Sequence, residues 1–355
     1  MITEESIKEK LSQVNYPGFS RDIVSFGLVK EISVNGEDVS VKISVATRDP
    51  KIPADIYKAC REVLDTIDGI GQVDVDLDIQ DPPQNAAAAG AGAAGGQVDK
   101  QGIPGIKHVI AVASGKGGVG KSTVASNLAI ALHKSGAKVG LCDCDLYGPS
   151  MPTMFGSNEQ PMATADNRII PIEAHGLKII SMGFLLQDDS PVIVRGPLAT
   201  KYTQQFLRQV EWGELDYLIL DLPPGTGDIQ LTIVQTVALD GAIIVTTPQE
   251  VALIDARKGT AMFAKVNVPI LGMIENMSWF DCPSDGERYY IFGQDGGKKE
   301  ADRLGVPLLG QIPINIETRE CGDQGQPIAL LPPERNTVSA AFSAVATQIR
   351  SKIEA

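Results

Sequence analysis

The chain contains the stretch Ser114-Gly115-Lys116-Gly117-Gly118-Val119-Gly120-Lys121-Ser122-Thr123. This stretch fits the phosphate-loop pattern Gly-x-x-x-x-Gly-Lys-[Ser/Thr]. Residues 109–113 before it are apolar and mostly β-branched, which predicts a buried strand, and residues 124–133 after it have helical spacing. A strand, a glycine loop and a helix in this order direct backbone N–H groups and a helix dipole at a bound phosphate. The stretch therefore predicts a nucleotide site in an α/β fold.

The fixed positions of this loop have predicted tasks. Lys121 is expected to neutralise the β- and γ-phosphate oxygens, and the Ser122 hydroxyl is expected to ligate Mg²⁺. The loop residues expected to bind the nucleotide are Gly115, Lys116, Gly117, Gly118, Val119, Gly120, Lys121, Ser122 and Thr123.

The composition narrows the class of protein. The 355 residues, of which 43% are apolar and 21% charged, suffice for a large core and more than one domain. The net charge of −13 argues against a surface that coats nucleic acid. No run approaches the roughly 18 apolar residues of a membrane span, and Met1–Glu5 lacks the features of a signal peptide. The five scattered cysteines indicate no disulfide framework, so we expect a reducing, cytoplasmic location.

The first part of the chain, residues 1–80, predicts a small α+β domain. Its expected order is helix, strand, strand, helix, strand, at Glu5–Val14, Asp22–Val34, Asp38–Ala46, Ile52–Ile67 and Gln72–Leu77. Cys60 falls inside the second helix and is expected in the core. Residues 81–101 are mostly Ala, Gly and Pro, which predicts a flexible linker.

The remainder, residues 102–355, alternates between strand-like and helical runs. Strands are predicted at Val109–Ala113, Lys138–Cys142, Tyr217–Asp221, Ala242–Thr247, Ile270–Glu275 and Leu308–Ile312. Helices are predicted at Ser122–Ser135, Leu198–Gln209, Asp228–Thr236, Ala252–Val266 and Val338–Lys352. Such alternation indicates an α/β fold with a mostly parallel, doubly wound sheet. Ligands of these sheets bind at the carboxyl ends of the strands.

Acidic residues occur where two of these strands end. Asp143 and Asp145 follow the second strand, and their spacing directs both carboxylates to one side, toward the phosphates. Asp221 ends the third strand, before the glycine-rich segment 222–228, and is expected to hold Mg²⁺ through water. Cys142 and Cys144 alternate with the carboxylates and are expected to pack in the interior.

The additional lysine of the loop, Lys116, is the basis of a first resemblance to a known class of proteins. The loop resembles the deviant phosphate loop of the SIMIBI class of P-loop NTPases, which includes MinD, ParA and the nitrogenase iron protein. The resemblance implies a homodimer in which Lys116 reaches the partner's phosphates. It also implies catalytic roles for Lys116, Lys121 and Asp145, with Asp145 orienting the attacking water and Asp143 supporting the Mg²⁺ shell. Asn276 corresponds to an asparagine that reads the adenine edge, which favours ATP over GTP.

Three later stretches narrow the resemblance to one family. Asp221–Asp228, Ile274–Ser278 and Ile312–Gly325 are similar to segments of the Mrp/ApbC family, P-loop ATPases that carry iron–sulfur clusters. The N-terminal unit resembles the MIP18-like (DUF59) domain, which is linked to iron–sulfur assembly. The resemblance implies a homodimer that hydrolyses ATP to ADP and phosphate. It also implies that the protein takes a [4Fe–4S] cluster from an assembly scaffold and passes it to apo-protein clients.

One cysteine motif departs from this family's pattern. After the segment equivalent to Asn276–Ser278, the family frequently has Cys-x-x-Cys, whose thiolates in a dimer give four ligands for one cluster. This chain instead reads Cys282-Pro283-Ser284-Asp285, with one thiolate per subunit. Two expectations stay open. Cys282 either ligates a cluster with help from an aspartate, Cys321 or a small thiol, or it is an exposed thiol without this role.

Two other functions fit parts of the sequence. A MinD/ParA-like switch acting on a membrane or a protein partner, without a cluster, would use the same loop. However, the amphipathic C-terminus, 337–355, has only Arg350 and Lys352 as basic residues, too few for a membrane anchor, and no basic stripe favours DNA. An electron-donating ATPase would need two well-placed cysteines per subunit, whereas only Cys282 is near such a position. We therefore expect neither a membrane nor nucleic acid as partner.

Overall fold

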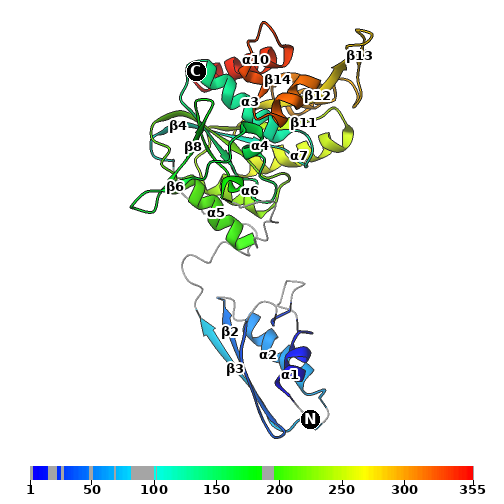
Figure 1. Ribbon diagram of the computed structural model, residues 1–355. Helices are drawn as coiled ribbons and strands as arrows, with labels where there is room; N and C mark the ends of the chain where they lie inside the picture. The colour runs from blue at the N-terminus through cyan, green and yellow to red at the C-terminus, as the bar shows by residue number, and fades with distance from the viewer. Residues whose placement is uncertain are drawn as a thin grey trace. The chain divides into compact units, whose positions relative to one another are not determined.

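The computed structural model describes residues 3–14, 22–24, 28–47, 51–67, 69–80, 100, 102–185 and 196–354. The chain forms two compact units, one within Met1–Gly96 and one within Gln97–Ala355 (Figure 1). The predicted linker, 81–101, lies outside the described residues except for Lys100, and it stays a prediction.

The N-terminal unit consists of a three-stranded sheet and two helices. Its elements are α1 (Glu4–Leu11), β1 (Val29–Asn35), β2 (Asp38–Ala46), α2 (Lys51–Leu64) and β3 (Val73–Gln80). β1 and β2 form an antiparallel hairpin whose turn places Gly36 at a φ of 67°, and β2 pairs parallel with β3. The predicted order of helices and strands is confirmed.

The first strand of this unit is shorter than predicted. The prediction begins it at Asp22, whereas β1 begins at Val29. The Ile23 N–H donates to the Val14 carbonyl at 2.9 Å, so this segment is bonded to the residues after α1 rather than to the sheet. Cys60 is fully buried, as predicted, and burial raises the pKa of its thiol to about 11.

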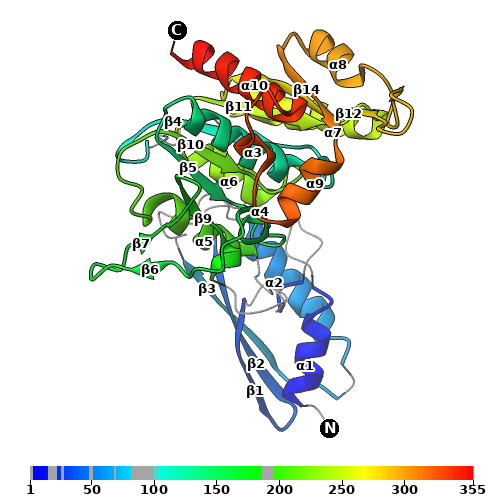
Figure 2. The same ribbon diagram turned by 45° about the horizontal axis from the view of Figure 1, so that its top comes forward.

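The C-terminal unit is built on a nine-stranded, mostly parallel sheet (Figure 2). Its strands are β4 (Ile106–Ala113), β5 (Val139–Asp143), β8 (Ile172–Ala174), β9 (Leu177–Ile180), β10 (Leu215–Asp221), β11 (Gly241–Thr246), β12 (Ile270–Asp281), β13 (Arg288–Tyr289) and β14 (Leu308–Ile314). A separate hairpin joins β6 (Met162–Ala163) and β7 (Ile169–Ile170).

Helices cover both faces of this sheet. The α-helices are α3 (Lys121–Lys134), α4 (Met151–Phe155), α5 (Gly196–Arg208), α6 (Asp228–Thr236), α7 (Glu250–Lys265), α8 (Gly296–Leu304), α9 (Ile316–Asp323) and α10 (Thr337–Ile353), with 3-10 turns η1 (Met182–Phe184) and η2 (Ile328–Leu330). In the described part of the chain, no helix combines the length and apolar composition that a membrane crossing needs.

The strand order places the phosphate loop at the centre of the sheet. The order is β13-β12-β11-β4-β10-β5-β9-β8, with β14 paired to β12. Alternate residues of β4 face opposite cores: Ile110 and Val112 pack with α3 and α10, and Val109 and Ala111 pack with α5 to α8. Because β4, β10 and β5 are adjacent and parallel, their carboxyl ends meet at one edge.

The predicted strands and helices of this unit are found within a few residues of their expected bounds, apart from β12. This strand continues to Asp281 instead of ending at Glu275, because it bulges and then pairs with β13. The elements that the sequence did not reveal are β6 to β9, β13, α4, α8 and α9. Those strands have two to four residues, too few for an alternating pattern.

Candidate functional site

The phosphate loop connects β4 to α3 and depends on its glycines. Gly118 and Gly120 have φ values of 80° and 79°, in the left-handed region that favours glycine. Gly115 is required for space, because a Cβ there would overlap the Asp255 carbonyl of α7. Gly120 is also the N-cap of α3, so the free N–H groups of the first turn follow the loop directly. The loop therefore presents the backbone donors that anion binding requires.

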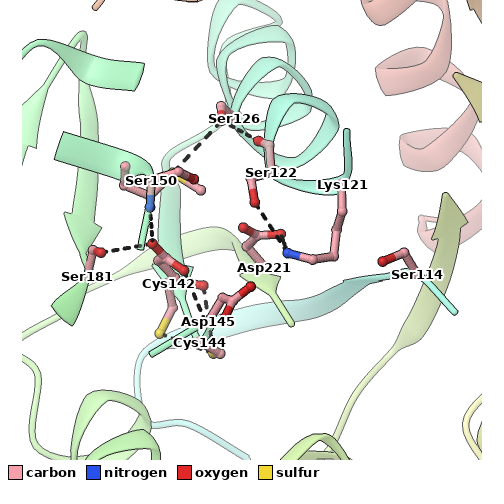
Figure 3. A network of polar contacts seen from close by, with 12 residues as sticks. Ser114, Lys121, Ser122, Ser126, Cys142, Cys144, Asp145, Ser150, Ser181 and Asp221 are labelled. Atoms are coloured by element: carbon pink, nitrogen blue, oxygen red, sulfur yellow. Dashed lines mark hydrogen bonds and ion pairs between the residues drawn. The ribbon is translucent and has the colours of Figure 1, made fainter. Parts of the chain in front are cut away.

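Lys121 and Asp221 form a buried ion pair next to this loop (Figure 3). Lys121 Nζ lies 2.6 Å from Asp221 Oδ1 and 3.3 Å from the Ser122 hydroxyl. The Lys121 side chain is 6% exposed and the Asp221 side chain 0%. Burial raises the pKa of Asp221 above its ordinary value, and the charge of Lys121 opposes this shift. Within the described structure, the second carboxylate oxygen of Asp221 is buried without a hydrogen-bond partner.

A second buried carboxylate, Asp143, lies on the neighbouring strand. Asp143 is in register with Asp221 across β5 and β10. It accepts hydrogen bonds from the Ser181 hydroxyl at 2.8 Å, the Asp145 N–H at 3.0 Å and the Ser150 N–H at 3.3 Å (Figure 3). Burial, and secondarily the charge of Asp221, raises the pKa of Asp143 to about 7. Sequence reasoning missed Ser181, since it follows a four-residue strand that has no recognisable pattern.

The residues predicted for Mg²⁺ fit a hard divalent cation. The negative charge of Asp145 also raises the pKa of Asp221, so three carboxylates act here against one lysine. The unpartnered Asp221 oxygen and the adjacent Ser122 hydroxyl are oxygen donors of the kind that Mg²⁺ prefers, directly or through water. The structure thus brings Ser122, Asp143 and Asp221 together, while their coordination of Mg²⁺ stays a prediction.

A cavity of about 720 Å³ adjoins the loop. Its walls come from α3, α4, α9, α10, the middle of β12 and the carboxyl end of β14, and they include Thr123, Met154, Asn276, Ile312, Thr318 and Phe342. This volume and the mixture of apolar walls with a few polar groups are typical of a site for a small organic ligand. The contribution of α9 was not predicted from the sequence.

Asn276 lies between this cavity and the loop. Its Nδ2 donates to the Val119 carbonyl at 2.9 Å, and a Cβ at Gly120 would overlap the same nitrogen. Among the described residues, none donates a hydrogen bond to its Oδ1. Asn276 also lines the cavity, so its oxygen is the group that is left to meet a ligand.

Lys116 and Asp145 differ from the buried pair, because both are half-buried. The Lys116 carbonyl accepts a hydrogen bond from the Ser114 hydroxyl at 2.9 Å, which orders the start of the loop. Within the described parts of the chain, the Lys116 ammonium group forms no ion pair. Both side chains are therefore accessible to groups from outside the subunit.

Cys282 lies in the turn between β12 and β13. Its N–H donates to the Glu287 carbonyl at 2.9 Å, and its Sγ lies 3.0 Å from the Ser284 hydroxyl. Cys282 and Cys321 are half-buried, whereas Cys142 and Cys144 are fully buried, as predicted, with their sulfurs 3.7 Å apart. Across the described residues, no three His, Cys, Asp or Glu side chains are grouped to hold a metal ion.

Each of the two units matches a known protein family. A family model described as an NUBPL iron-transfer P-loop NTPase matches residues 105–350, and one described as an iron–sulfur cluster assembly protein matches residues 4–77. A relative from Synechocystis sp., named iron–sulfur cluster carrier protein, is 41% identical over 99% of this chain and 98% of its own length. A relative of the same name from Deinococcus radiodurans is 42% identical over 98% of this chain and 95% of its own length.

Solved structures agree with these matches. A nucleotide-binding protein from Archaeoglobus fulgidus, in complex with ADP, is 39% identical, with a TM-score of 0.57 over 64% of this chain and 90% of that chain. The cell-division ATPase MinD from Pyrococcus furiosus is 23% identical, with a TM-score of 0.52 over 69% of this chain and 99% of that chain, which shows the shared fold alone. The predicted fold class and family resemblance are confirmed. The chain belongs to the family of NUBPL iron-transfer P-loop NTPases.

Proposed function

We propose that this chain is an ATPase that accepts a [4Fe–4S] cluster and passes it to apo-proteins. The observation that carries the proposal is the buried Lys121–Asp221 pair beside a glycine loop, in a chain of an iron-transfer NTPase family. Relatives over nearly the whole length are named iron–sulfur cluster carrier protein, which supports the proposed cargo.

ATP binding begins with an exchange of partners at Lys121. The triphosphate contacts the N–H groups of residues 115–123, and Lys121 leaves Asp221 for the β- and γ-phosphate oxygens. The nucleoside occupies the cavity beside α3, where the Asn276 oxygen accepts a hydrogen bond from the adenine amino group. Guanine has an oxygen at that position, which would repel the Asn276 oxygen, so the site favours ATP.

Ser122, Asp143 and Asp221 would hold Mg²⁺, directly or through water. Mg²⁺ held there would neutralise negative charge on the phosphates during phosphoryl transfer. Because Asp221 loses Lys121 when the phosphates bind, the arrival of a cation prevents an uncompensated buried carboxylate. Nucleotide and Mg²⁺ are therefore expected to bind together.

Hydrolysis uses the two half-buried side chains. Asp145 orients the attacking water, and Lys116 reaches the phosphates bound by a second subunit of a homodimer. Both roles come from the resemblance to the SIMIBI ATPases, and the accessibility of both residues supports them. Positioning and charge, rather than covalent chemistry, carry this reaction.

The cluster is the cargo, and Cys282 is its proposed thiolate ligand. Two subunits supply two Cys282 thiolates, so the remaining iron sites need an aspartate, Cys321 or a small thiol. An assembly scaffold would load the cluster and apo-proteins would receive it, with neither a membrane nor nucleic acid as partner. A reducing cytoplasm suits a proposal in which Cys282 stays a free thiol, and all five cysteines of the chain are free.

Reactivation of an apo-enzyme that needs a [4Fe–4S] cluster tests the proposal. Reconstituted wild type is expected to restore activity of the apo-enzyme, and Cys282→Ala treated identically is not. ATP hydrolysis by both proteins is measured as the control for folding. A wild type that hydrolyses ATP but never reactivates the apo-enzyme would leave a nucleotide switch without a cluster.

A further inference from the structure

Met277, next to Asn276, has an unusual backbone conformation. Its φ is 56°, in the left-handed region. The other described non-glycine residues with positive φ are Asn167, His175, Asn267 and Asp295, whose residue types adopt this region more readily. For methionine, the left-handed conformation is disfavoured by a factor of about 5 to 30. Such strain gathers at switch regions and needs surrounding contacts to hold it.

The contacts that hold Met277 come from both sides of a bulge in β12. Asn276 is opposite Ile312 and Phe280 is opposite Ile314, so β12 has extra residues between these pairs. The Ser278 hydroxyl donates to the Glu275 carbonyl at 2.8 Å, which closes the bulge.

The bulge also contacts the phosphate loop directly. Asn276 donates to the Val119 carbonyl, and a Cβ at Gly120 would lie 3.6 Å from the Met277 Cε. Met277 itself lines the cavity beside α3. A shift of the loop backbone at Val119 would therefore reach Met277 through a single hydrogen bond.

Beyond the bulge, the same strand leads to Cys282. β12 continues to Asp281 and pairs with β13 through Phe280 with Tyr289 and Asp281 with Arg288. The Cys282 carbonyl then accepts the Gly286 N–H at 2.8 Å, which closes the turn. A rotation of the backbone at Met277 would thus move the segment that carries the Cys282 thiol.

We propose that Met277 is a positioning residue that couples nucleotide at the phosphate loop to the environment of the Cys282 thiol. The two-state element is the Met277 backbone, which changes between the left-handed and an extended conformation. Nucleotide displaces the Val119 carbonyl, Asn276 follows, and the balance at Met277 shifts toward the extended form. The inference rests on the proposed nucleotide binding, but it does not require a bound cluster.

Two substitutions at Met277 shift this balance in opposite directions. Met277→Gly stabilises the left-handed form, since glycine adopts it without penalty, so nucleotide would move the hairpin less. Met277→Val destabilises the left-handed form, since β-branched residues fit it worst, so the protein without nucleotide would resemble the wild type with nucleotide. The matched control is Asn267→Gly, which relieves a φ of 53° in the connection that precedes the opposite end of β12.

The test measures how fast iodoacetamide alkylates Cys282, by peptide mass spectrometry. Rates are compared without nucleotide and with saturating Mg²⁺ and a non-hydrolysable ATP analogue, whose binding is measured on the same samples. In wild type and Asn267→Gly, the analogue is expected to change the Cys282 rate by about fivefold or more. In Met277→Gly, the analogue should change the Cys282 alkylation rate by less than about twofold. In Met277→Val, the rate without nucleotide should already be near the wild-type rate with the analogue.

The outcomes separate this inference from the proposed function. If wild type binds the analogue and the Cys282 rate does not change, the coupling is wrong, whatever the protein carries. If both Met277 variants respond as wild type does, or Asn267→Gly loses the response as well, Met277 is not the coupling element. If wild type fails to bind the analogue, the nucleotide site itself is wrong.

Discussion

The phosphate loop and the Cys282 hairpin differ in how completely one chain builds them. At the loop, Lys121, Asp143 and Asp221 are buried and tied to one another or to neighbouring hydroxyl and N–H groups. At the hairpin, Arg288 and Asp281 pair at the surface, with side chains 47% and 52% exposed. The nucleotide site is therefore largely formed within one chain, whereas the hairpin supplies only the Cys282 thiol to a cluster site.

This difference fits the two tasks. Hydrolysis needs charged groups that are held in place once ATP has bound, because electrostatic stabilisation depends on groups that do not reorganise during the reaction. A cluster site must receive its cargo and release it again, so it needs a segment that can move. Segments that move belong to the less buried parts of a protein. The comparison predicts large effects from changes at the loop and small effects from changes at the hairpin surface.

The largest effect is expected for Lys121→Ala. Loss of the cation that meets the phosphates should lower ATP hydrolysis by about a thousandfold or more, measured as phosphate release. Lys134→Ala is the control on the same helix, because Lys134 binds the carbonyls of Ala329, Leu330 and Leu331 and should leave hydrolysis unchanged. Hydrolysis at the wild-type rate in Lys121→Ala would remove the basis of the site assignment.

The second effect is on stability. Lys121→Ala leaves Asp221 buried without its cation, so the free energy of unfolding without nucleotide should fall by about 3 kcal/mol. The double variant Lys121→Ala/Asp221→Ala should lose less than the sum of the two single losses, since the pair is coupled. Denaturant unfolding followed by tryptophan fluorescence reports this unit, which contains Trp212 and Trp279. Additive losses would show that the ion pair is not formed.

The third effect compares two glycines of the loop. Gly115→Ala would place a Cβ on the Asp255 carbonyl and should cost about 2 kcal/mol of stability. Gly117→Ala meets nothing within 4 Å and should cost less than about 0.5 kcal/mol. Thermal unfolding without nucleotide separates them. Equal losses in the two variants would mean that the loop is not packed against α7 as described.

The smallest effect is expected at the hairpin. Arg288→Ala removes an exposed ion pair with Asp281 and the stacking of the guanidinium 4.3 Å from the Trp279 ring centre. Because exposed pairs contribute little, the unfolding midpoint and ATP hydrolysis should not change measurably. The Trp279 fluorescence should still shift, which verifies that the contact was lost. A large fall in hydrolysis would show that the hairpin surface is part of the ATPase site.

The sequence predicted the loop and its flanks well, because their chemistry is local. Backbone geometry requires glycine at 118 and 120, the space beside Asp255 requires it at 115, and the adjacent strands alternate regularly. Asp143 and Asp221 were also predictable, since they end buried parallel strands, although they are 78 residues apart and meet only through the sheet.

Long-range contacts and irregular backbone were not predictable in the same way. Ser181 meets Asp143 because β9 pairs parallel with β5, with Ile180 opposite Cys142, and α9 enters the cavity wall without a periodic signal. The bulge at Met277 breaks the strand pattern, so the sequence ended β12 at Glu275 and missed its continuation toward Cys282. No spacing rule reveals a left-handed methionine.

The most direct test of the cargo is anaerobic analysis of iron and sulfide, with absorbance spectra, after reconstitution of wild type, Cys282→Ala and Cys321→Ala. We predict one [4Fe–4S] cluster per wild-type dimer and none in Cys282→Ala, while the Cys321→Ala result shows whether this second thiol contributes. A cluster retained in Cys282→Ala, or no cluster in wild type, would contradict the account of Cys282 as the ligand of a carried cluster.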